Sequence, residues 1–333
     1  MPPLEPMLAK LRDDIPTGEG WLYEPKWDGF RALVFRDGPE LHIASRDGKD
    51  LERYFPELVP ALAGALPGRA VIDGEVVITG EAGLDFDALL QRIHPAVSRI
   101  TKLAAETPGS FVAFDALALG DEDLTDRPFG ERRPLLEAAL GDGGSVPPSE
   151  RATRVLASPQ TEDPDVARDW FTTFESLGLD GLIAKRTEDP YTPGRRTMAK
   201  IKHRRTADCV VGGYRLSKAG DGIGSLLLGL YDDAGTLHYV GHTSSFKAAE
   251  RRRLLGELRR LEGEGGFGTG RTPGGPSRWT GARGDETWAR LRPELVCEVS
   301  FDHMQGDRFR HAARFLRWRD DKPPRACTID QVH

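Results

Sequence analysis

The sequence has very few cysteines and no long apolar run. Its 333 residues include 3 cysteines, Cys209, Cys297 and Cys327, which are odd in number and too far apart to match a zinc site. No stretch of about 18 apolar residues is present, which excludes a membrane-spanning helix. The first residues lack the basic and then apolar pattern of a secretion signal. We therefore expect a cytoplasmic protein with reduced thiols and no membrane partner.

The chain also lacks the excess of positive charge that marks many nucleic-acid-binding proteins. Its net charge is −6, from 46 Lys and Arg against 52 Asp and Glu. The charge is uneven, because residues 206–333 carry 20 basic and 17 acidic residues, whereas the remainder carries 26 and 35. A mildly basic C-terminal third fits a face that meets an anion, and drift in composition explains it about as well.

Length and hydrophobic pattern indicate two domains, residues 1–205 and 206–333. The first domain reads as α+β with largely antiparallel strands. Its strand-like runs are 30–36, 40–45, 70–79 (interrupted at 73–75), 111–119, 180–185 and 198–202, and its helical runs are 52–66, 84–93 and 163–177. The second domain has short strand-like runs at 208–215, 225–232, 236–243 and 294–301, with an amphipathic helix at 246–262. Short strands with one helix suit a small OB-type barrel.

The most informative segment is Lys26-Trp27-Asp28-Gly29-Phe30-Arg31. Pro25 cannot donate to a sheet ladder and Gly29 permits a tight turn, so we expect the lysine in a loop at a strand end. A lysine whose pKa is lowered by burial or by nearby cations can act as a nucleophile. Alone, the hexapeptide also fits a surface loop with a salt bridge.

Further segments follow in a fixed order, which constrains function more than any single motif. They are Ser45-Arg46-Asp47-Gly48, Asp73-Gly74-Glu75, Phe114-Asp115, DGLIAK at 180–185, Lys200-Ile201-Lys202 and Arg319-Asp320-Asp321-Lys322. The ordered set extends over nearly the whole chain. It resembles the covalent nucleotidyltransferases, namely ATP-dependent DNA ligases, RNA ligases and mRNA capping enzymes. The stretch KIKHRRTADCVVGGYR at 200–215 and the ending FLRWRDDKPPRAC are most similar to bacterial DNA ligases of the ligase C and ligase D classes.

This resemblance implies a fold and a reaction. The fold is an N-terminal antiparallel-sheet adenylation domain followed by a C-terminal OB-fold β-barrel. The reaction is the sealing of 5′-phosphate/3′-hydroxyl nicks in double-stranded DNA through a covalent lysine–AMP and then a DNA-adenylate, in DNA repair. Each step places charge on phosphate oxygens, which lysines, arginines and Mg²⁺ or Mn²⁺ stabilise. We further expect a nucleoid-associated monomer, with repair polymerases or end-binding proteins as partners.

The resemblance also assigns residues to the ATP site. Lys26 is the adenylated nucleophile, and Asp28 orients the lysine or a metal-bound water. Arginine forks suit phosphate, and both Arg31 and Arg46 resemble phosphate- and ribose-contacting residues. The base and sugar residues are Glu24 for the adenine amino group, Glu75 for the ribose hydroxyls, and Phe114 stacking on adenine. Plain alternatives are a surface ion pair for Arg31 and Arg46, a strand-edge acid for Glu24, a turn acid for Glu75 and a core aromatic for Phe114.

The remaining residues concern phosphate and metal. Asp180 stands where most relatives carry glutamate, and with Glu75 it is the expected ligand of the divalent metal. Lys200 and Lys202 alternate on a strand and so share one face, aimed with Lys185 at the nucleotide; such a pair is otherwise common on exposed strands. In the second domain the resemblance gives Arg319, Asp321 and Lys322 the task of orienting pyrophosphate, which requires that domain to close over ATP.

Two other functions remain open at this point. One is an RNA ligase or GTP-using capping enzyme, against which Trp27 and the C-terminal segments argue. The other is a non-catalytic nucleic-acid-binding protein, against which the retention of Lys26 and its charged partners argues. In the glycine-rich segment 263–284, Phe267 and Trp279 are candidates for contact with DNA.

Overall fold

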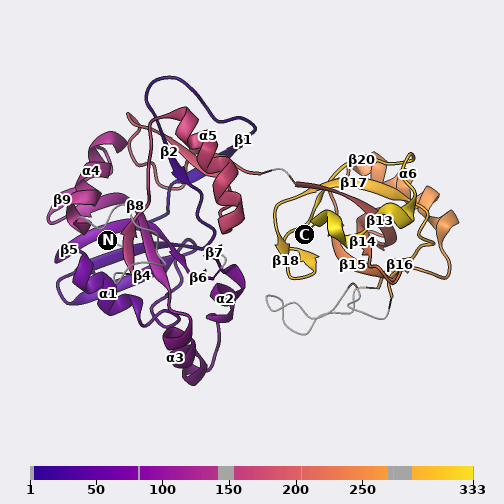
Figure 1. Ribbon diagram of the computed structural model, residues 1–333, viewed down its shortest axis with the longest axis horizontal. Helices are drawn as coiled ribbons and strands as arrows, with labels where there is room; N and C mark the ends of the chain where they lie inside the picture. The colour runs from indigo at the N-terminus through magenta and orange to yellow at the C-terminus, as the bar shows by residue number, and fades with distance from the viewer. Residues whose placement is uncertain are drawn as a thin grey trace. The chain divides into compact units, whose positions relative to one another are not determined.

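The computed structural model describes residues 4–81, 83–141, 154–203, 205–268, 273 and 287–332 (Figure 1). It divides into two compact units, Met1–His203 and Arg204–His333. Each unit has its own sheets and its own apolar core. In the described part of the chain no helix is both long and apolar enough to cross a membrane.

The first unit contains two main sheets. A four-stranded sheet has the order β1-β12-β11-β2, and a larger sheet has the order β10-β8-β5-β3-β4 with β9 added to β8. Pairing is antiparallel except at β1–β12 and β10–β8. The strands are β1 (Leu8–Arg12), β2 (Trp21–Pro25), β3 (Phe30–Asp37), β4 (Glu40–Ser45), β5 (Arg69–Val77), β6 (Thr79–Gly80), β7 (Gly83–Leu84), β8 (Ser110–Leu119), β9 (Glu122–Asp123), β10 (Val155–Ala157), β11 (Leu182–Arg186) and β12 (Arg196–Ile201). The helices are α1 (Leu58–Ala65), α2 (Phe86–Gln91), α3 (Val97–Glu106), α4 (Phe129–Leu140) and α5 (Pro164–Thr173), followed by the 3₁₀ turn η2 (Phe174–Leu177).

Alternation along the strands divides the core of this unit into layers. On β3, Val34 packs in the core that includes α1, whereas Leu33 faces the four-stranded sheet. On β11, Ala184 packs with α5 on the outer side of the four-stranded sheet. Side chains at the intervening positions of β2, β11 and β12 therefore face the region between the two sheets, and this is where the charged residues gather.

The second unit is a small OB-type β-barrel. Its main sheet has the order β15-β14-β13-β17-β20, with β16 paired to β13. A bridge between Thr243 and Ala313 connects the segments at the two edges of this sheet. The elements are β13 (Arg205–Leu216), β14 (Ile223–Tyr231), β15 (Leu237–Thr243), α6 (Ala248–Leu258), η3 (Arg259–Leu261), β16 (Ala289–Arg290), β17 (Val296–Phe301), β18 (Met304–Gln305), β19 (Arg308–Phe309), β20 (Arg314–Trp318), η4 (Pro324–Ala326) and η5 (Ile329–Val332).

Several expectations from the sequence are wrong in detail. Strand β5 runs without a break through Asp73-Gly74-Glu75, with irregular register to β8, because Gly74 lets Phe111 and Val112 approach its backbone. The helix expected over 52–66 begins only at Leu58. Helices α3 and α4 and strand β20 were not expected, since their apolar residues are interrupted by charged ones.

Phe267 is not a candidate for DNA contact. Its side chain is buried in the core of the second unit, in ring contact with Tyr239 and Trp288. The absence of a side chain at Gly212 and Gly229 makes room for its ring. Trp279 lies outside the described residues.

Candidate active site

The Lys26 loop joins β2 to β3 and is attached to the segment before β11. The Lys26 amide donates to the carbonyl of Gly181 (2.8 Å), and the Asp180 amide donates to the carbonyl of Lys26 (3.0 Å). Gly29 has no positive φ; it is needed because a Cβ there would lie 2.2 Å from the Val76 carbonyl oxygen. The tight turn attributed to Gly29 is therefore a close approach of two strands instead.

Two lysines converge on one carboxylate oxygen. The Lys26 Nζ lies 2.6 Å from Asp180 Oδ2, and the Lys202 Nζ lies 2.7 Å from the same atom. The carboxylate is nearly buried, whereas the side chains of Lys26 and Lys202 are 20% and 25% exposed. Two ammonium groups on one acid leave an excess of positive charge facing solvent, which suits an anionic ligand.

Lys200 belongs to the same cationic group. Burial lowers its pKa, and the neighbouring charges of Lys202 and Lys26 lower it further, opposed by Asp180. Lys200 lies on β12 between the buried residues Ala199 and Ile201, so its side chain points to the opposite face of the strand from theirs, as expected. Lys202 follows directly after that strand.

On the facing sheet, Arg31 is anchored to a buried acid. Its Nε and Nη2 donate to the two carboxylate oxygens of Asp73 (2.6 and 2.5 Å), and Asp73 also accepts from the Tyr191 hydroxyl (2.7 Å). Glu75 lies two residues on, close enough to Arg31, Lys26 and Asp28 for their charges to shift its pKa. Burial is the largest influence and raises the pKa of Glu75 to about 7.

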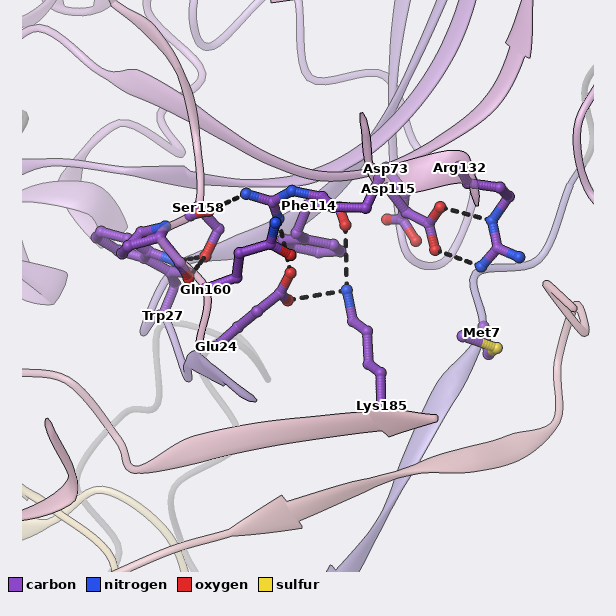
Figure 2. Close-up of polar contacts among 12 residues, drawn as sticks. Met7, Glu24, Trp27, Asp73, Phe114, Asp115, Arg132, Ser158, Gln160 and Lys185 are labelled. Carbon is purple, nitrogen blue, oxygen red and sulfur yellow. Dashed lines mark hydrogen bonds and ion pairs between the residues drawn. The ribbon is translucent and has the colours of Figure 1, made fainter. Parts of the chain in front are cut away.

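Glu24 lies at the centre of a buried network (Figure 2). Its Oε1 accepts from Arg133 Nη1 and its Oε2 lies 2.8 Å from Lys185 Nζ. Lys185 also donates to the carbonyl of Phe114 (3.1 Å), and Arg133 donates to the carbonyl of Ser158. This network links β2, β8, β11 and α4 around one point, because burying these charges requires that each be paired.

Phe114 is buried on β8 with cations against its ring. The Arg31 guanidinium carbon is 4.4 Å from the ring centroid and the Lys185 Nζ is 4.9 Å from it. Trp27, next to the lysine, donates its indole N–H to the Ser158 hydroxyl (2.9 Å). Lys185 connects the two residues expected around adenine, because it pairs with the carboxylate of Glu24 and donates to the carbonyl of Phe114.

Other expected residues lie elsewhere. Arg46 is 65% exposed and pairs with its neighbour Asp47, so nothing in its contacts joins it to the lysines. Arg319, Asp321 and Lys322 belong to the second unit. Arg319 binds both Asp321 and Asp208, and Lys322 Nζ lies 2.8 Å from Asp208. The Arg319 guanidinium lowers the pKa of Asp321 to about 2.

Sequence reasoning missed the residues that hold this site in shape. Asp73 was passed over although it belongs to the Asp73-Gly74-Glu75 motif, and its burial could have been expected from its apolar neighbours. Arg133 and Asp208 gave no usable signal, since their partners are 109 and 111 residues away in the chain. Charged residues inside otherwise apolar elements are the only hint, because such charges must find partners.

Comparison with known proteins identifies the family of the chain. Residues 6–202 match the model of the ATP dependent DNA ligase domain, and residues 219–322 match that of the ATP dependent DNA ligase C terminal region. The chain is 52% identical to DNA ligase C1 of Mycolicibacterium smegmatis over 99% of this chain and 94% of that protein. It is 51% identical to DNA ligase C of Mycobacterium tuberculosis, over 100% and 94%.

Among solved structures, a Lig E DNA ligase matches with a TM-score of 0.57 at 18% identity, over 95% of this chain and 99% of that one, which supports the fold. The cationic group around Lys26, the two matched family models and the full-length relatives lead to one conclusion. The chain belongs to the ATP-dependent DNA ligases.

Proposed function

We propose that Lys26 is the residue through which this ATP-dependent DNA ligase carries AMP. The observation behind the proposal is the convergence of Lys26 and Lys202 on Asp180, with Lys200 beside them. The neutral amine of Lys26 attacks the α-phosphorus of ATP, a nitrogen–phosphorus bond forms, and the bond to the β-phosphate oxygen breaks to release pyrophosphate. The neighbouring cations Lys200 and Lys202 stabilise the negative charge that develops on phosphate.

The other residues then take complementary tasks. Lys200 and Lys202 contact the α-phosphate, and Asp28 orients the lysine. Glu75 accepts hydrogen bonds from the ribose hydroxyls, as a carboxylate with two oxygens can. Glu24 and Phe114 hold the adenine, with Lys185 fixed between them. Arg31 contacts the nucleotide while it stays hydrogen-bonded to Asp73. Arg46 contacts it only if its exposed loop moves.

We propose that a divalent cation binds at the acids of this site. Asp180 and Glu75 supply carboxylate oxygens, the ligands that Mg²⁺ and Mn²⁺ take in proteins. The ion would screen the charge of the phosphates when bound. Asp180 is one methylene shorter than the glutamate usual in the family, and its pairing with both Lys26 and Lys202 shows that it still reaches them.

The two units divide the work. We propose an adenylation domain over residues 1–205 and an OB domain over 206–333, the latter bringing Arg319, Asp321 and Lys322 to the pyrophosphate in the first step. The substrate is a nick in double-stranded DNA with 5′-phosphate and 3′-hydroxyl ends, met during repair in the cytoplasm at the nucleoid. The enzyme acts as a monomer, with repair polymerases or end-binding proteins as partners.

A label-transfer assay tests the central step. The protein is incubated with α-labelled ATP or GTP and Mg²⁺ or Mn²⁺, and then chased with nicked DNA. We expect covalent label from ATP, no label in Lys26→Ala, and discharge of the label as sealed product. Label from GTP would move the protein to the capping enzymes. Lack of label from both nucleotides, once prior adenylation is excluded by intact mass, would overturn the role of Lys26.

A further inference from the structure

A short segment spans the distance between the two expected adenine residues. At one end, the Ser158 amide donates to the carbonyl of Ala113 (2.7 Å), next to Phe114. At the other end, Thr161 and Tyr23 exchange backbone hydrogen bonds of 3.0 and 2.8 Å, next to Glu24. Residues 158–161 therefore run from the position of the stacking aromatic to that of the acid. Gln160 lies within this segment, and Figure 2 shows it with Glu24, Ser158 and Phe114.

The carboxamide of Gln160 is held in one orientation. Its Nε2 donates to Glu137 Oε1 (3.0 Å), the same oxygen that accepts from Arg133 Nε (2.9 Å). Turning the amide over would place its oxygen against the carboxylate, which cannot donate when ionised. The Gln160 Oε1 is thereby directed away from Glu137, and Arg133 connects this arrangement to Glu24.

That oxygen is a buried acceptor without a partner. Among the residues that the structure describes, Gln160 Oε1 is one of a few buried side-chain polar atoms that lack a hydrogen bond. Leaving a buried acceptor unsatisfied is unfavourable, so this oxygen is a candidate to receive a donor from a bound ligand. Both oxygens of Glu24 already have cationic partners, Arg133 and Lys185.

We propose that Gln160 Oε1 accepts a hydrogen bond from the 6-amino group of adenine and so helps to select ATP. The inference rests on the proposed function, in which Glu24 and Phe114 hold the base. The amino group of adenine carries two N–H donors, which allows one bond to Gln160 and another to the second lone pair of a Glu24 oxygen. Guanine presents an acceptor oxygen at the same position, and that oxygen would face Gln160 Oε1 without a proton between them.

The test compares two nucleotides that differ only at this group. Transfer of nucleotide to the protein is followed by intact mass with ATP and with purine riboside 5′-triphosphate, which lacks the 6-amino group. In Gln160→Met we expect the KM for ATP to rise about tenfold, as for loss of one hydrogen bond. The KM for purine riboside triphosphate should change less than about twofold, because this nucleotide has no amino group to donate to Gln160. The preference for ATP over GTP should narrow in the same variant.

Two further variants keep the result interpretable. Gln160→Asn retains the amide but withdraws it by one methylene. It replaces Gln160→Met if that variant does not fold, and it should likewise raise the KM for ATP but not that for purine riboside triphosphate. Gln91→Met, at an exposed position of α2, should leave both KM values unchanged. An equal rise in KM for both nucleotides, or no rise for ATP, would overturn the role of Gln160. If wild-type protein takes no nucleotide at all, the proposed function fails first and this inference fails with it.

Discussion

Among the residues that the structure describes, Glu75 has a pKa that the fold moves to near neutral pH. Burial raises its pKa from 4.5 to about 7, although Arg31 and Lys26 act in the opposite direction. A carboxyl group whose pKa is higher in the folded state binds its proton more tightly there. The free energy of unfolding therefore falls as pH rises from about 4.5 to about 7, and stays lower above that range.

Glu75→Gln should remove this dependence. The amide stays neutral at every pH, so the variant should be close to wild type in stability near pH 5 and more stable near pH 8. The gain between these limits is at most about 3 kcal/mol, which is the free-energy cost of ionising a carboxyl group whose pKa is raised from 4.5 to about 7. Thermal melting of both proteins at several pH values measures it. If the difference in melting temperature between variant and wild type is the same at pH 5 and pH 8, the fold does not raise the pKa of Glu75.

At the scale of elements, two glycines differ in the space around them, so substituting each tests whether close packing requires glycine there. Gly29 lies where β3 passes β5, and a Cβ there would meet the Val76 carbonyl oxygen at 2.2 Å and Glu75 Cγ at 2.8 Å. Gly64 lies in α1 with open space where its Cβ would be. Alanine therefore forces backbone apart at the first position and adds helix propensity at the second.

Gly29→Ala should lower the free energy of unfolding by about 1–3 kcal/mol, as for an overpacked site, and should weaken adenylation because Lys26 and Glu75 are displaced. Gly64→Ala should raise stability by up to about 1 kcal/mol and leave adenylation unchanged. Denaturant unfolding and the label-transfer assay measure the two effects. Wild-type stability and activity in Gly29→Ala would show that the strands adjust without strain.

The same elements show which features of the fold and site can be predicted from the sequence. The strand expected at 30–36, observed as β3 (Phe30–Asp37), and the alternation around Lys200 could be predicted, because period-2 patterns show which side chains share a face. The pairs of charged residues that meet across the site could not be predicted from the sequence. Arg133 meets Glu24 only because α4 packs on the sheet. For Arg46 the plain alternative, a surface ion pair, is what the structure contains. Gly29 was identified correctly as special, but for a turn and not for close packing.

At the scale of the whole molecule, the candidate machinery is distributed over both units. Lys26 and its cationic neighbours belong to the first unit, whereas Arg319 and Lys322 belong to the second. Within that second unit Asp208, which is 12% exposed, receives Arg319 Nη1 on both carboxylate oxygens at 2.9 Å and Lys322 Nζ at 2.8 Å. Of the three chemical steps, only the first involves pyrophosphate, so a defect in these residues should affect the steps unequally.

Asp208→Asn tests that division. The amide cannot pair with two cations, so Arg319 and Lys322 lose their common anchor. We expect adenylation of the enzyme by ATP to slow by about tenfold or more, because the charge-assisted hydrogen bonds that hold Arg319 and Lys322 are weakened. Sealing of a nick that already carries AMP should change by less than about twofold. The matched control is Glu298→Gln, since Glu298 is the register partner of Asp208 on β17 and binds only the exposed Arg317 among the pairs described. Equal slowing of both steps in Asp208→Asn would instead indicate general damage to the barrel, because a fold defect has no reason to spare the later step.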